Sequence, residues 1–174
     1  MSFPRAPHRL PDDFATAIGH CVAGFGYLEE ALKRAIYAIS QHHLGADPSE
    51  AALRRWVQRI EDLADDSLGT LIDSFAAAMG KNPDMAEDHE LVEALRVLRD
   101  DRNLICHASW KPTPREGEWH PDFINTRGKS FDGTFSVAQL DEVNARCLGL
   151  TRRVVGIMRR TGIEGGWGDE TLPR

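Results

Sequence analysis

The sequence predicts an all-α fold, in which four or five helices form one bundle and an irregular insertion precedes the last helix. Three observations support this prediction. A length of 174 residues is typical of one domain with a single core, so we expect residues 1–174 to form one domain. Apolar residues recur at spacings of three and four over most of the chain, which indicates amphipathic helices. Prolines and glycines are instead concentrated in residues 109–135, where they exclude a long helix.

The first predicted helix is long. Residues 11–13, Pro-Asp-Asp, offer its N-terminal cap, and Gly45 ends it. Each glycine inside the helix costs up to about 1 kcal/mol relative to alanine. We therefore expect Gly19, Gly24 and Gly26 to mark places where another helix approaches closely. The apolar stripe of the helix consists of Ile18, Val22, Phe25, Leu28, Leu32, Ile36 and Ile39.

Three further helices are predicted before the insertion. Residues 47–50, Asp-Pro-Ser-Glu, have the composition of a helix start, with proline in the first turn. The third helix covers residues 68–79, and the fourth runs from near Asp84 to about His107. The apolar face of the second helix consists of Leu53, Trp56, Val57, Ile60 and Leu63.

The insertion at residues 109–135 is predicted to be a loop or an irregular β-hairpin that packs on the bundle. Its tryptophans, Trp110 and Trp119, are expected to anchor it to the core, and base stacking is the alternative role. Ser136 and Gln139 then form a capping box that starts the last long helix. We expect residues 1–11 and 165–174 to be flexible.

The composition favours a cytoplasmic protein without a metal or cofactor. No stretch reaches the roughly 18 to 20 apolar residues that a membrane span needs, and the first residues lack the apolar region of a secretion signal. The cysteines, Cys21, Cys106 and Cys147, have no C-x-x-C spacing and are expected to be buried as small apolar residues. Because His42 and His43 are adjacent, they point to different sides of a helix and do not suggest a metal site.

Charge is distributed unevenly along the chain, although the formal net charge is −6. Residues 61–93 contain ten acidic residues and one lysine, whereas residues 96–115 contain five basic residues and two aspartates. The second region is therefore either a locally basic patch or an ordinary solvated face. The paired arginines of the last helix, at positions 152–153 and 159–160, are open to the same two interpretations.

Arg102 is the strongest physical anomaly of the sequence. On a helical wheel of 3.6 residues per turn it falls within an apolar stripe. An unpaired buried charge is very costly, so the guanidinium either pairs with an acid such as Glu29 or Glu30, or it faces a cleft or a second subunit. The stripe consists of Leu91, Leu95, Leu98 and Ile105.

The segment 102–107, Arg-Asn-Leu-Ile-Cys-His, resembles the R-x4-6-H motif of the HEPN superfamily of helical bundles. Arg102 matches the arginine of that motif, Asn103 its frequent polar neighbour, and His107 its histidine. Residues 25–32, Phe-Gly-Tyr-Leu-Glu-Glu-Ala-Leu, also resemble the opening helix of many small bacterial HEPN-like proteins.

The resemblance implies a metal-independent endoribonuclease of the toxin or defence type. The 2′-hydroxyl of the RNA would attack the adjacent phosphate, with His107 as general acid or base. Arg102 would stabilise charge on the phosphoryl oxygens, and Asn103 would orient the phosphate or the histidine. The family also implies a homodimer with a shared cleft, RNA as a ligand, and a nucleotidyltransferase-like antitoxin as a partner. The alternative is a catalytically inactive helical dimer that binds a partner protein or a nucleotide.

Two geometric points accompany the motif. His107 follows Arg102 by five residues, about 140° further around an ideal helix, so we expect the helix to unwind near its end if both side chains face one cleft. A second R-x4-H match, Arg115 to His120, lies among prolines and glycines and serves as an internal comparison.

Overall fold

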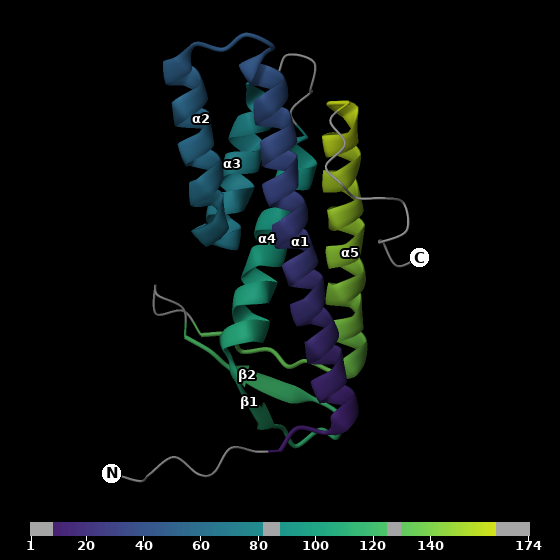
Figure 1. Cartoon of the computed structure of the whole chain (residues 1–174). Coiled ribbons are helices and arrows are strands. Elements are labelled where there is room, and N and C mark those ends of the chain that lie inside the picture. Colours follow the sequence, from purple (N-terminus) through teal and green to yellow (C-terminus); the bar gives the residue numbers. More distant parts are fainter. Residues whose placement is uncertain (1–8, 82–87, 125–129, 163–174) are drawn as a thin grey trace, which may run out of the picture.

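A computed structural model describes residues 9–81, 88–124 and 130–162, and confirms a helical bundle with a hairpin before its last helix. A single 3₁₀ turn, Leu63–Asp65, follows the second helix. The regular elements of the described residues are α1 (Asp12–Leu44), α2 (Glu50–Asp62), α3 (Leu68–Gly80), α4 (His89–His107), β1 (Ser109–Pro112), β2 (Trp119–Asp122) and α5 (Val137–Arg160) (Figure 1).

The long helix α1 spans the molecule from end to end, and α5 runs beside it (Figure 1). Gly24 lies where these two helices meet, since an added Cβ would stand 2.7 Å from Oδ1 of Asn144. The expectation of close approach is thus confirmed for Gly24. It is wrong for Gly19 and Gly26, which have nothing within 4 Å.

The predicted core stripe of α1 is correct in its second half and shifted in its first half. Phe25, Leu28 and Leu32 are buried as expected, whereas Val22 is 47% exposed. The cause is the position of α5, which packs on the neighbouring strip of α1. That strip consists of Phe14, Ala17, Cys21 and Gly24.

Side-chain caps fix most of the helix starts. Ser49, Ser67 and Ser136 each accept a hydrogen bond from a backbone N–H of the first turn, and the capping box with Gln139 is present. The helix α4 begins at His89 instead of near Asp84, because the side chain of Asp88 accepts a hydrogen bond from the backbone N–H of Leu91 at 3.0 Å. Residues 82–87 lie outside the described part of the chain.

The hairpin is antiparallel and is joined to the bundle by aromatic rings. Trp119 exchanges two backbone hydrogen bonds of 2.8 Å with Phe135, just before α5. The ring of Phe14, at the start of α1, lies 5.2 Å from that of Trp110 and 5.7 Å from that of Trp119. The prediction that these tryptophans anchor the insertion is confirmed.

Two burial predictions need correction. The helix α2 has no buried residue, and Leu53 and Val57 are each more than 40% exposed. Other side chains of α2 make its contacts, since Trp56 donates to Ser40 of α1 and Arg59 donates to Ser74 of α3. Cys21 and Cys147 are buried, and burial raises the pKa of their thiols to about 11 and about 12. Cys106 is exposed, contrary to prediction.

No helix among the described residues is both long enough and apolar enough to cross a bilayer. The predicted flexibility of residues 1–11 and 165–174 concerns residues that are mostly outside the described ranges. Of these segments only Arg9, Leu10 and Pro11 are described, and Pro11 is the N-cap of α1.

Candidate functional site

Arg102, Asn103 and His107 lie on the last turns of α4, at the end of the bundle that carries the hairpin (Figure 1). The helix stays regular through His107, and the backbone N–H of Ala108 donates to the carbonyl of Leu104 at 3.0 Å. Ala108 then adopts an extended conformation, and β1 starts at the next residue. The helix therefore does not unwind as the wheel geometry suggested.

The side chains of Arg102 and His107 nevertheless meet. Nη1 of Arg102 lies 3.2 Å from Nε2 of His107, within hydrogen-bond distance. The two residues lie about 140° apart around the helix. The arginine side chain is long enough to reach along the helix surface to the imidazole. Contact between the two motif residues thus needs no distortion of α4.

The chemistry of the two groups determines which one donates in this contact. A guanidinium has donors and no acceptor, so Nε2 of His107 must accept the hydrogen bond with its lone pair. A general base needs this lone pair, so the contact with Arg102 must open before His107 can act as one.

Arg102 has two further partners within its own chain. Its Nη2 lies 3.5 Å from Oε1 of Glu29 on α1, and its Nη1 lies 3.5 Å from Oδ1 of Asn103. The side chains of Arg102 and Glu29 are 29% and 28% exposed. The sequence left open whether this arginine pairs with an acid or faces a ligand site, and the structure shows the Glu29 pair together with partial access to solvent.

Packing and one ion pair hold this end of α4 in place. Leu104 and Ile105 are buried between the motif residues, while His107 is exposed. Asp101 pairs with Arg146 of α5 at 2.5 Å, and burial raises the pKa of its carboxyl group. Sequence reasoning missed this ion pair, because no sequence pattern relates positions 45 residues apart.

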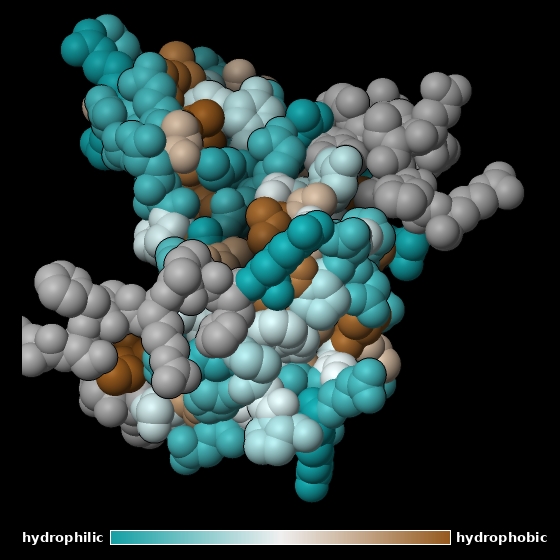
Figure 2. All heavy atoms as spheres, turned by 90° about the horizontal axis from the view of Figure 1, so that it is seen from below, coloured by the Kyte–Doolittle hydropathy of each residue, from teal (hydrophilic) through white to brown (hydrophobic). Residues whose placement is uncertain are grey.

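The basic residues near the motif are largely neutralised. Arg96 pairs with Asp73 and Glu93, Arg99 with Asp100, and Lys111 with Asp122. The expectation of a basic patch is therefore weakened, and the solvated-face interpretation fits better. Figure 2 shows that the visible part of this end is mostly hydrophilic, with small separate apolar areas.

The second R-x4-H match differs from the first. Nη1 of Arg115 lies 3.6 Å from Oε1 of Glu118, and Nδ1 of His120 lies 2.9 Å from the carbonyl oxygen of Gly133. Each side chain thus has a separate partner, and the spacing alone does not bring the two together.

Within the described ranges, no group of three or more His, Cys, Asp or Glu side chains could hold a metal ion. Comparisons with protein-family models, curated proteins and solved structures gave no match. Function must therefore be argued from the geometry of Arg102, Asn103 and His107.

Proposed function

We propose that this protein is a HEPN-like, metal-independent endoribonuclease of the toxin or defence type. The observation that carries the proposal is the 3.2 Å contact between Arg102 and His107. It brings a guanidinium that can bind phosphate next to an imidazole nitrogen at an accessible helix end. The proposal places the protein in the cytoplasm, where its RNA substrates are.

The proposed reaction uses the RNA's own 2′-hydroxyl as the nucleophile. Nε2 of His107 takes the proton of that hydroxyl, the 2′-oxygen forms a bond to phosphorus, and the bond from phosphorus to the 5′-oxygen breaks. The products are a 2′,3′-cyclic phosphate and a 5′-hydroxyl, whose proton comes from a second imidazole or from water. Arg102 donates to the phosphoryl oxygens as negative charge develops on them.

Substrate binding requires a change of partners at Arg102. A phosphate would replace Glu29 and the imidazole as acceptors of the guanidinium, which releases the lone pair of His107 for the 2′-hydroxyl. Asn103 would keep the guanidinium oriented through its side-chain oxygen, 3.5 Å away. In this scheme Glu29 holds Arg102 in place until RNA arrives.

A homodimer belongs to the proposal, because a second copy would supply the second imidazole. The face of α1 that carries Glu29 offers surface for it: Val22, two turns earlier, is 47% exposed, and Gly26 has open space around its Cα. A nucleotidyltransferase-like antitoxin is the proposed partner that would cover this site.

The test is incubation of the purified protein with RNA in the presence of EDTA. Cleavage with 2′,3′-cyclic phosphate ends is expected for the unmodified protein, and strong loss is expected for Arg102→Ala and His107→Ala. Arg54→Ala and His43→Ala are matched controls, since both residues are exposed and lie near the other end of α1. Equal activity in all four variants would reject the assignment.

The catalytically inactive dimer is the second candidate, and the Arg102–Glu29 ion pair favours it. An arginine that is already paired with a carboxylate of its own chain needs no phosphate ligand. Absence of RNA cleavage, together with a folded dimer in sizing chromatography, would support this candidate over the nuclease.

A further inference from the structure

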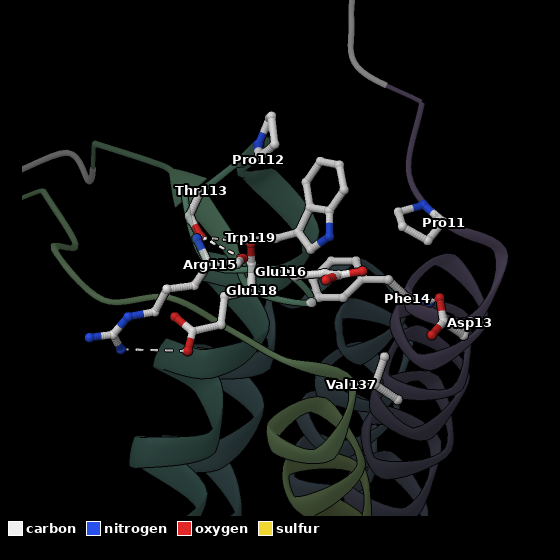
Figure 3. Close-up of a pocket in the computed structure, with 11 residues that line it drawn as sticks. Pro11, Asp13, Phe14, Pro112, Thr113, Arg115, Glu116, Glu118, Trp119 and Val137 are labelled. Carbon is white, nitrogen blue, oxygen red and sulfur yellow. Dashed lines mark hydrogen bonds and ion pairs between the residues drawn. The ribbon is translucent and has the colours of Figure 1, made fainter.

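A cavity separate from the α4 site lies between the start of α1 and the hairpin (Figure 3). We refer to it as the hairpin cavity. Its volume is about 390 Å³, within the range of small-molecule and peptide sites. Its apolar lining consists of Pro11, Phe14, Pro112, Trp119 and Val137, and its charged lining consists of Asp13, Arg115, Glu116 and Glu118.

The turn that forms one wall of the hairpin cavity is internally bonded. The hydroxyl of Thr113 donates to the carbonyl of Glu118 at 3.0 Å, and Arg115 pairs with the carboxylate of Glu118 (Figure 3). Gly117 has a φ of 77°, which glycine adopts without strain. This wall is therefore formed before any ligand binds.

The ring N–H of Trp119 is the most informative group in the hairpin cavity. Trp119 is 8% exposed, and among the described residues its ring nitrogen has no hydrogen-bond acceptor. The ring nitrogen of Trp56, by contrast, donates to the hydroxyl of Ser40 at 2.9 Å. Buried indole N–H groups usually find a partner. In Figure 3 the nitrogen of Trp119 lies on the side of the ring that faces Pro11, so the donor points into the cavity.

These features define the chemistry of the ligand. Surfaces of aromatic and proline rings bind extended, proline-containing peptides, whose preformed backbone presents carbonyl oxygens to ring N–H donors. Asp13, Glu116 and Glu118 outnumber the single cation Arg115, so the rim favours a positively charged peptide. The expected ligand is therefore a short peptide with prolines and a basic residue.

The chain itself contains such a peptide. Residues 1–8, which lie outside the described ranges, have the sequence Met-Ser-Phe-Pro-Arg-Ala-Pro-His. Pro4 and Pro7 are separated by Arg5 and one alanine, which is the P-x-x-P spacing that such sites bind. This segment ends three residues before Pro11, which lines the cavity, so its effective concentration there is high. We propose that the hairpin cavity binds residues 1–8 of the same chain, with Trp119 donating to a peptide carbonyl and Glu116 facing Arg5.

Nuclear magnetic resonance of the ring N–H groups tests this proposal in the full-length chain. The Trp119 signal is assigned by its loss in Trp119→Phe. We expect it to shift between the unmodified chain and the variant Pro4→Ala/Pro7→Ala, whereas the Trp56 signal stays in place because that ring is already bonded to Ser40. A synthetic peptide of residues 2–8 added to the double variant should return the Trp119 signal, with saturation, to its position in the unmodified chain.

Charge variants add a second readout. Glu116→Lys should weaken binding of the synthetic peptide about threefold, as expected for one exposed ion pair, and Glu61→Lys on α2 should leave it unchanged. A Trp119 signal that is the same in the unmodified chain and the double variant, and that the peptide does not move, would overturn the proposal. Equal shifts of the Trp56 and Trp119 signals would also contradict it.

Discussion

Two segments of this chain have the same R-x4-H spacing and different structures. Arg102 and His107 lie on a regular helix and contact each other at 3.2 Å. Arg115 lies in the hairpin turn, His120 lies on β2, and each has its own separate partner. The helix fixes the backbone positions of Arg102 and His107 at a distance that the long arginine side chain can bridge, whereas the turn and the strand place Arg115 and His120 independently. The spacing is therefore informative only when one continuous helix carries it.

The largest difference between the segments is expected from removing the two histidines. His107→Ala should lower RNA cleavage by about 10²- to 10⁴-fold, the usual contribution of a general base. His120→Ala should leave cleavage within about twofold, since only a hydrogen bond to Gly133 is lost. Initial rates of RNA cleavage in EDTA measure the effect of each substitution. Similar losses in the two variants would mean that the helical pair has no special role.

A smaller effect is expected from Arg102→Lys. Lysine keeps the charge and loses the planar pair of donors, so cleavage should fall about tenfold while substrate affinity changes little. Separate values of kcat and KM show which of the two changes. Arg115→Lys is the matched control and should alter neither, and an unchanged kcat in Arg102→Lys would mean that only the charge matters.

Glu29→Gln tests whether the carboxylate competes with phosphate for Arg102. Removal of one partly exposed ion-pair partner should tighten RNA binding about two- to fivefold. The expected result is a lower KM, because the guanidinium no longer has to leave a carboxylate. Weaker binding would instead show that Glu29 positions Arg102 for the substrate.

The smallest effect is expected on the stability of α4, the helix that carries Arg102 and His107. Asp88→Ala removes the cap of α4 and should lower the free energy of unfolding by about 1 kcal/mol, or Tm by about 2–4 °C. The hydrogen bond from the backbone of Leu91 is the main reason that the pKa of Asp88 is lowered, and Arg153 adds to it.

This pKa direction gives the cap a defined pH dependence. Because the pKa is lower in the folded than in the unfolded chain, the stabilisation by Asp88 is complete above the unfolded value and disappears as the pH falls through the folded value. Thermal unfolding of the two proteins should therefore differ at neutral pH and converge in strong acid. A difference that persists in acid would mean that the cap does not act through the charged carboxylate.

Much of the fold could be predicted from local sequence signals, and the contacts between distant elements could not. Gly45 and the Ser136–Gln139 box act within a few residues, so they correctly placed the end of α1 and the start of α5. The exposure of Val22 depends on where α5 packs, which periodicity does not specify. The Arg102–Glu29 pair was foreseen as one alternative because a charge on an apolar stripe needs a partner, but its contact with His107 depends on the course of one side chain.

The short junction between α4 and β1 restricts where residues could be inserted into this chain. Only Ala108 separates the imidazole of His107 from the first strand residue, while the core holds the helix and the aromatic rings hold the hairpin. An insertion at this junction would have to displace either α4 or the hairpin, and both are held by packing. The turn between β1 and β2 could instead lengthen toward solvent. Related sequences that keep this site should therefore differ in the length of residues 113–118 and agree in the length of the link at residue 108.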